Sequence, residues 1–285
     1  MYSDVSVILP AKNESASLRD LLPALSKTLP GAEILVVDDG STDDTAEIAE
    51  QSGCTVIRHP YSMGNGAAVK SGARKASTDI IVFMDADGQH APEDVPRLVE
   101  GVADGHDMVV GARSRDSQAN SGRAVANRIY NWLASKIVGH RIEDLTSGFR
   151  AVRRERFLEF LSILPNGFSY PTTITMCFFR AGYGVSYRLI YASKRIGASH
   201  IKPLRDGARF FLVIFRVATL YSPLKLFVPV AFAIFAVGVL YYGYTYLFFN
   251  RFTNMSALLF STAVIVFMMG LISEQITFLI YKKDK

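Results

Sequence analysis

The chain is poor in cysteine and lacks the marks of several large protein classes. Its 285 residues include two cysteines, Cys54 and Cys177, which fits a reducing compartment where a disulfide is not expected. No run of lysine and arginine interleaves with aromatic residues, although the net charge is +5, and this absence excludes nucleic acid as a partner. No signal peptide is expected, because residues 5–9 already have the pattern of a strand.

Charged residues are nearly absent from two long apolar runs near the carboxyl terminus. Residues 224–249 contain one, Lys225, and residues 257–281 contain one, Glu274. Each run exceeds the roughly 20 residues that a helix needs to cross a bilayer, so the runs predict a transmembrane helical hairpin. The alternative is a pair of buried helices in a soluble protein. We expect Glu274 to face the partner helix or another subunit, so a homo-oligomer is one expected arrangement.

Basic residues gather at both ends of this predicted hairpin. The connecting loop holds one, Arg251, and the flanking ones are Arg205, Arg209, Arg216, Lys225, Lys282, Lys283 and Lys285. The positive-inside rule therefore places both termini and the globular part on the cytoplasmic side of the cytoplasmic membrane. Residues 203–222 mix arginine with phenylalanine and leucine, which predicts an amphipathic helix in the bilayer interface; the alternative is a core-facing helix. The expected domains are thus 1–202, 203–222 and 223–285.

The first 115 residues alternate strand-like and helix-like stretches. Strands are predicted at 5–9, 33–37, 55–58, 80–84 and 108–111, and helices near 15–28, 42–52, 67–76 and 92–102. This rhythm predicts an α/β, Rossmann-like fold with a mostly parallel sheet. Ser41 is expected to cap the second helix, and Pro92 to lie in the first turn of the fourth. A basic amphipathic helix is predicted from about 121 to 139.

Acidic and amide side chains follow the fourth predicted strand at alternate positions. Asp85, Asp87 and Gln89 come directly after the continuous apolar run 80–84, which is typical of a buried parallel strand. Such a strand delivers them to the carboxyl edge of the sheet, where hard oxygen ligands suit Mg²⁺ or Mn²⁺ shared with substrate phosphates. The alternative is a solvated Asp-rich turn. Residues 10–14 and 38–41 end the first two strands, so all three groups are expected to converge on one crevice.

Two glycines, Gly64 and Gly66, open the third predicted helix. With Asp85 about 20 residues later, they invite a dinucleotide-binding interpretation. We reject a nicotinamide or flavin site, because the glycines follow the third strand rather than the first and no third glycine completes the pattern. A helix start that cradles phosphate, with Lys70 nearby, and a plain pair of loop glycines both stay open.

Five motifs, taken in order, resemble glycosyltransferase family 2, and within it the polyprenyl-phosphate glycosyltransferases. They are residues 10–14, 36–43, 64–66, 85–90 and 144–150. The resemblance covers residues 4–200 and implies a GT-A catalytic domain that binds a UDP- or GDP-linked sugar across the carboxyl edge of the sheet. It also implies a divalent cation, Mg²⁺ or Mn²⁺, which offsets the negative charge that gathers on the departing diphosphate.

The resemblance implies roles for residues at this edge. Pro10, Asn13 and Glu14 would contact the nucleoside, and Asp38 would accept a hydrogen bond from its base. Asp85, Ala86 and Asp87 would frame the diphosphate, and Asp85, Asp87 and Gln89 the metal. Lys70 completes the set expected to bind the nucleotide sugar.

The expected acceptor is a phosphate rather than a hydroxyl. The family's polysaccharide synthases carry a Gln-x-x-Arg-Trp motif, which is absent around Trp132. A phosphate monoester is already an anion near neutral pH, with a second pKa of about 6, so it needs a cationic clamp and no base. Arginine suits this role because its planar fork binds phosphate oxygens in pairs. The resemblance implies a clamp of Arg113, Arg123, Asn127 and Arg195.

The sequence thus predicts an inverting, metal-dependent transfer of a hexose-type sugar to polyprenyl (undecaprenyl or dolichyl) phosphate at the membrane. Asp87, Arg113 and Arg123 are expected to be catalytic. For Arg195 the alternative is a surface ion pair, and Arg150 is expected to brace the 147–149 turn. The two rival functions are transfer to a hydroxyl acceptor, such as a glycan or glycolipid, and a catalytically silent membrane scaffold.

Overall fold

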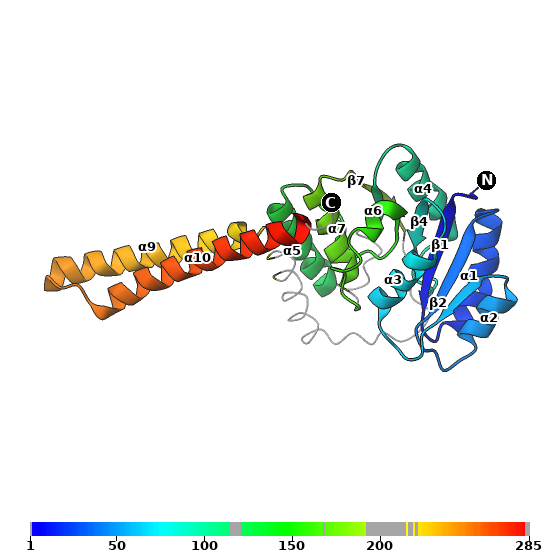
Figure 1. Ribbon diagram of the computed structural model, residues 1–285, viewed down its shortest axis with the longest axis horizontal. Helices are drawn as coiled ribbons and strands as arrows, with labels where there is room; N and C mark the ends of the chain where they lie inside the picture. The colour runs from blue at the N-terminus through cyan, green and yellow to red at the C-terminus, as the bar shows by residue number, and fades with distance from the viewer. Residues whose placement is uncertain are drawn as a thin grey trace. The chain divides into compact units, whose positions relative to one another are not determined.

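The computed structural model (Figure 1) describes residues 2–113, 121–167, 169–191, 215, 219 and 222–282, with their side chains except those of 121–127 and 280–282. The chain divides into two compact units, Met1–Phe210 and Phe211–Lys285. The first unit carries the sheet and the second carries two long helices. The segment 203–222 lies almost entirely outside the described residues, so the predicted interfacial helix and its boundaries remain predictions.

A seven-stranded sheet organises the first unit, in the spatial order β3-β2-β1-β4-β6-β5-β7. The strands are β1 (Val5–Ala11), β2 (Glu33–Asp38), β3 (Thr55–Arg58), β4 (Ile80–Phe83), β5 (Met108–Arg113), β6 (Arg150–Arg153) and β7 (Val185–Ile190). The first four are parallel neighbours, and β5 is parallel to β7. Because β6 runs antiparallel to both β4 and β5, those two strands run in the same direction. The carboxyl ends of β2, β1, β4 and β5 therefore share one edge, and the predicted mostly parallel fold is confirmed.

Helices cover both faces of this sheet, as continuous apolar strands require. One layer holds α1 (Ser15–Thr28), α2 (Thr45–Gln51), the short η1 (Pro92–Asp94) and α4 (Val95–Ala103). The other holds α3 (Asn65–Lys75), α6 (Arg154–Leu158) and α7 (Tyr170–Ala181). In Figure 1, α1 and α2 lie on one side of β1 and β2, and α3 lies on the other.

Side-chain spacing explains how these layers attach. Alternate β1 residues point to opposite faces, so Leu9 joins the core beneath α1 while Ile8 meets α3. On α1 the buried leucines recur at spacings of three and four residues: Leu18, Leu21, Leu22 and Leu25. Burying each contributes about 1.5–3 kcal/mol. On the other face, a Cβ at Gly72 would lie 2.4 Å from Cγ2 of Ile8, so glycine lets α3 approach the sheet closely.

The helix starts differ in one place from the sequence prediction. Ser41 does not cap the second helix, which begins at Thr45 after Asp44. The Ser41 hydroxyl instead accepts a hydrogen bond from Asn13 N at 2.9 Å, and the Asp43 carboxylate accepts the Thr45 N–H at 3.2 Å. Pro92 is confirmed at the start of the turn that leads into α4. The predicted basic helix is confirmed as α5 (Ser121–Val138).

The second unit is a helical hairpin of α9 (Pro223–Phe249) and α10 (Asn254–Lys282). Both helices are long and apolar enough to cross a membrane, and only 11% and 17% of their most apolar windows are buried. This low burial argues against the alternative of two core helices. Oε2 of Glu274 accepts a hydrogen bond from Leu224 N at 3.4 Å. Glu274 therefore faces the partner helix, one of the two expected arrangements.

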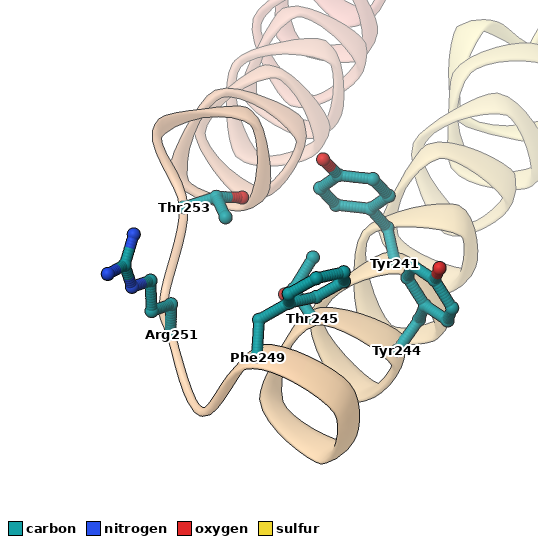
Figure 2. A pocket seen from close by; sticks show the side chains of 6 residues that line it. All are labelled: Tyr241, Tyr244, Thr245, Phe249, Arg251 and Thr253. Carbon is teal, nitrogen blue, oxygen red and sulfur yellow. The ribbon is translucent and has the colours of Figure 1, made fainter.

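A pocket of about 510 Å³ lies where the two helices join (Figure 2). Its lining residues are Tyr241, Tyr244, Thr245, Phe249, Arg251 and Thr253. They belong to the end of α9 and the connecting loop, and none of them is among the residues predicted to bind substrate.

Candidate active site

Three strand ends meet at one edge of the sheet, as the sequence predicts. β1 lies between β2 and β4, so the segments that follow these strands are neighbours. Asn13 links two of them, because its side-chain Oδ1 accepts the Thr42 N–H at 2.8 Å while its backbone N–H donates to Ser41 Oγ. Asn13 has a φ of 55°, a left-handed conformation that asparagine tolerates better than most residues. Local backbone geometry thus helps to build this edge.

Asp38 is the last residue of β2 and Asp39 follows it, and the two carboxylates accept different hydrogen bonds. Oδ1 of Asp38 accepts the Ser41 N–H at 2.9 Å, which closes a tight turn at the edge. The Asp39 carboxylate accepts hydrogen bonds from the His59 ring, the Ser62 hydroxyl and the Met63 and Gly64 N–H groups, all at 2.8–2.9 Å.

Asp39 thereby fastens the 59–64 loop to the end of β2. Burial raises the pKa of Asp39, but these hydrogen bonds, that of His59 first, bring the pKa below its ordinary value. The other His59 nitrogen lies 2.9 Å from Ser71 Oγ on α3. The sequence prediction assigned no role to Asp39; the polar His59 directly after β3 was the available signal.

Asp85, Asp87 and Gln89 lie beyond the end of β4 and are each partly exposed, whereas Ala86 between the aspartates is buried. The Ala86 carbonyl accepts the Ser17 hydroxyl at 2.6 Å, which holds this segment against α1. Oδ1 of Asp87 accepts the Gln89 N–H at 3.2 Å. The alternation predicted from the sequence is therefore kept, with polar side chains on either side of a buried alanine.

These oxygens fit a divalent cation that shares its shell with phosphates. Within the described ranges no group of three or more His, Cys, Asp or Glu side chains could hold a metal by itself. Mg²⁺ is usually held by one or two carboxylates plus substrate phosphates and water, and Asp85 and Asp87 supply that pair. Oδ1 of Asp85 also accepts the Asn65 amide at 3.4 Å, which orients this carboxylate from the start of α3.

Arg113 ends β5 on the same edge and is held by Asp144. Its Nε and Nη2 donate to the two Asp144 oxygens at 2.8 and 3.0 Å, and Nη2 also donates to Thr146 Oγ1 at 2.7 Å. Burial lowers the pKa of Arg113, but the hydrogen bonds and charge of Asp144, with a smaller contribution from Asp85, raise it overall. Burial raises the pKa of Asp144, yet its bonds to Arg113 lower it overall. At neutral pH both groups are therefore charged.

His90 follows this acidic segment and is buried against Phe149, with ring centroids 4.8 Å apart. Burial lowers its pKa to about 4, against the opposing charge of Asp87, so the ring is neutral at pH 7. Its Nδ1 has no hydrogen-bond partner among the described residues. Arg150 is completely buried and donates to the Ser147 carbonyl, as expected of a residue that braces the 147–149 turn.

The start of α3 packs against another loop. A Cβ at Gly64 would lie 2.5 Å from the Asn166 carbonyl oxygen, and one at Gly66 would lie 2.2 Å from that of Pro165. The glycines therefore have a packing role, and a phosphate-cradling role for this helix start remains a prediction. Lys70 donates to the Leu164 carbonyl at 3.1 Å and to the Asn166 side chain, so in this structure its ammonium group ties α3 to the same loop.

The structure places the remaining clamp residues only in part. Arg123 and Asn127 lie on α5, but their side chains are outside the described part of the chain. Arg195 lies outside it altogether. Pro10 is buried near the end of β1, and Glu14, directly before α1, accepts a hydrogen bond from the Ser17 hydroxyl at 3.2 Å. The structure thus brings Asn13, Asp38 and Asp85 to one edge of the sheet but ties Lys70 to the 164–166 loop, and the substrate roles of the donor-side and acceptor-side residues remain predictions.

Comparisons with known proteins match this architecture. Residues 6–161 match the model of the glycosyl transferase family 2, and residues 222–279 match that of the GtrB C-terminal hairpin. The structure resembles glucosyl-3-phosphoglycerate synthase from Mycobacterium tuberculosis in complex with Mg²⁺ and UDP, with a TM-score of 0.63 and 23% identity over 75% of this chain and 79% of that one. At this level of identity, the likeness is evidence for the fold alone.

Curated relatives share more of the sequence. The glycosyltransferase AglJ of Haloferax volcanii is 29% identical, over 95% of this chain and 93% of the relative. An undecaprenyl-phosphate 4-deoxy-4-formamido-L-arabinose transferase of Pseudomonas savastanoi is 31% identical, over 83% and 72%. The dolichol-phosphate mannosyltransferase of Pyrococcus furiosus is 37% identical, but the matched part spans only half of its length. The family match covers more than half of the chain, and the protein therefore belongs to glycosyl transferase family 2 and is a glycosyltransferase.

Proposed function

We propose that this glycosyltransferase moves a hexose-type sugar from a UDP- or GDP-linked donor to the phosphate of a polyprenol. The observation that carries the proposal is the meeting of two carboxylates, Asp85 and Asp87, with the Asp144-held Arg113 at one edge of the sheet. Such a set handles two anions, a departing diphosphate and an attacking phosphate. The names of two relatives, an undecaprenyl-phosphate transferase and a dolichol-phosphate transferase, support the same acceptor.

The donor would lie across the ends of β1, β2 and β4. Pro10, Asn13 and Glu14 would contact the nucleoside, and Asp38 would accept a hydrogen bond from its base. Mg²⁺ or Mn²⁺ would be held by Asp85 and Asp87 with Gln89, and when bound it would offset the charge of the leaving diphosphate. Neighbours of the same fold crystallised with UDP and either cation support this assignment.

The acceptor phosphate would be held by Arg113, with Arg123, Asn127 and Arg195 completing the clamp. A hydroxyl acceptor needs a base whose pKa lies near the working pH, and the lowered pKa of Asp144 makes that carboxylate a poor base. A phosphate dianion needs none. Its in-line attack at the anomeric carbon, opposite the departing diphosphate, would invert the configuration at that carbon.

The hairpin would keep this chemistry at a membrane. A polyprenol cannot leave the bilayer, so the enzyme must work at its surface, and α9 and α10 are long and apolar enough to anchor it there. The match of residues 222–279 to the GtrB C-terminal hairpin supports this role. The basic residues at both ends of the hairpin favour a cytoplasmic catalytic domain.

The proposal is tested by incubating membranes that contain the full-length protein with labelled UDP- and GDP-sugars and undecaprenyl or dolichyl phosphate. We expect label in a lipid that mild acid cleaves, because a glycosyl phosphate is acid-labile. Label that appears only in polymer or glycolipid would identify a hydroxyl acceptor. No incorporation with any donor would indicate a silent scaffold, and either result would overturn the proposal.

A further inference from the structure

The amide side chain of Asn131 on α5 is hydrogen-bonded at both ends to one turn of the chain. Its Nδ2 donates to the Glu143 carbonyl at 2.6 Å, and its Oδ1 accepts the Leu145 N–H at 3.0 Å. Because an amide has one donor end and one acceptor end, these two bonds fix its orientation. Asn131 thereby holds the residues on both sides of Asp144, much as a neighbouring strand would.

Asp144 in turn holds Arg113. Its side chain is almost fully buried, and both of its oxygens accept hydrogen bonds from the Arg113 guanidinium. The Thr146 and Ser147 N–H groups also donate to Asp144, at 3.1 and 3.2 Å. A continuous series of hydrogen-bonded groups therefore runs from α5, through the 143–145 turn, to the carboxyl end of β5.

The same helix carries the other predicted phosphate-binding positions. Arg123 and Asn127 stand eight and four residues before Asn131, and positions four apart lie on one side of a helix, about one turn from each other. One turn after Asn131, the Ser135 hydroxyl accepts the Ile142 N–H at 2.9 Å. This side of α5 is thus fastened to the 142–145 segment at two successive turns.

We propose that Asn131 is a positioning residue, which sets α5 relative to Arg113 so that both sides of the acceptor clamp reach one phosphate. The inference rests on the proposed function and goes beyond it, since Asn131 is not among the residues proposed to contact either substrate. An error of about 1 Å in the placement of a binding group is enough to lower a rate strongly. Loss of Asn131 therefore weakens the use of the lipid phosphate as acceptor. Binding at the donor side, which is built on β1, β2 and β4, stays unchanged.

The first test measures Asn131→Ala in the full-length enzyme with both substrates varied. We expect kcat/KM for polyprenyl phosphate to fall about 10-fold, equivalent to about 1.4 kcal/mol of transition-state binding, while KM for the nucleotide sugar stays within about twofold. Gln51→Ala is the matched control, because Gln51 is an exposed amide at the end of α2, away from this network. We expect Gln51→Ala to leave kcat/KM for polyprenyl phosphate and KM for the nucleotide sugar unchanged.

A double-mutant cycle separates positioning from a general loss of structure. If Asn131 acts through Asp144, then Asn131→Ala added to Asp144→Asn lowers kcat/KM for the lipid little further than the larger single loss, because residues that act as a unit are not additive. Multiplicative losses in the double variant would overturn the inference. So would an equal rise in KM for the donor, or wild-type constants in Asn131→Ala.

Failure of this inference is distinguishable from failure of the proposed function. Absence of lipid-linked product from the wild type rejects the function, whereas an active wild type with an unaffected Asn131→Ala rejects only the positioning role. Should Asn131→Ala melt below the assay temperature, Asn131→Asp replaces it. That variant keeps an acceptor for the Leu145 N–H but puts a charged carboxylate oxygen in place of the donor to the Glu143 carbonyl, and the same selective loss is expected.

Discussion

Replacing Asp39 by asparagine tests whether the donor-side edge depends on a single buried carboxylate. Each Asp39 oxygen accepts two hydrogen bonds: Oδ1 from His59 and Met63, and Oδ2 from Ser62 and Gly64. An asparagine amide would put its NH₂ group in place of one of these oxygens. Whichever way the amide turns, a backbone N–H, of Met63 or of Gly64, then faces another donor.

The expected loss follows from that mismatch. Leaving one buried donor without an acceptor costs about 1–3 kcal/mol, and the remaining bonds lose the strength that a charged acceptor gives them. Asp39 is only 5% exposed, so water cannot replace the lost acceptor. We expect Asp39→Asn to lower the free energy of unfolding by about 3 kcal/mol, or the melting temperature by about 6–12 °C for a unit of this size.

Thermal unfolding of the detergent-solubilised protein at pH 7, followed by circular dichroism, measures this shift. Asp20→Asn is the matched control, because Asp20 is an exposed residue of α1, and it should change the melting temperature by less than about 2 °C. The 59–64 loop should also become susceptible to proteolysis in Asp39→Asn. A melting temperature equal to that of the control would refute the assignment of Asp39 as the anchor of this loop.

Three further predictions follow from the same geometry. Asp87→Ala should abolish sugar transfer with an unchanged melting temperature, and near-normal turnover would contradict the metal assignment. Gly66→Ala should destabilise the protein by about 1–3 kcal/mol in chemical denaturation, because its Cβ would lie 2.2 Å from the Pro165 oxygen. The folded-state pKa of His90, about 4, lies below the ordinary 6.5. The unfolded chain therefore binds more protons between these two pH values. Between pH 7 and pH 4 the free energy of unfolding of the wild type should fall by about 3 kcal/mol more than that of His90→Phe. Parallel falls of the two unfolding free energies with pH would contradict this.

The sequence pattern predicts the first half of the sheet well because each of its strands is locally distinct. The apolar segments of β1 (interrupted only by Ser6), β2 and β4 are each bounded by polar turns, and parallel order then brings Asn13, Asp38 and Asp85 to one edge. The parallel order of the strands is therefore enough to predict that these residues lie at one edge, without any other tertiary contact.

The strands β6 and β7 were missed for a different reason. β6 has only four residues, two of them arginines, and its place between β4 and β5 comes from pairing on both sides rather than from an apolar run. The buried Arg150 guanidinium donates there to the Ser147 and Pro171 carbonyls and to the Thr175 hydroxyl, while its Nε has no partner among the described residues. β7 pairs with β5 at the edge of the sheet, and most of its residues are only partly buried.

The pairing of Arg113 with Asp144 was also not predicted from the sequence, and it changes the charge balance of the site. An arginine alone would add a full positive charge, but here a buried carboxylate offsets it. The segments that follow β1 and β4 then contribute Lys12 against Glu14, Asp85 and Asp87, so this edge has no surplus of positive charge with which to hold a diphosphate. The carboxylates that would repel a diphosphate are the ones that suit a divalent cation. Under the proposed function, this arrangement of charges favours metal dependence, and Arg113 would hold the second anion.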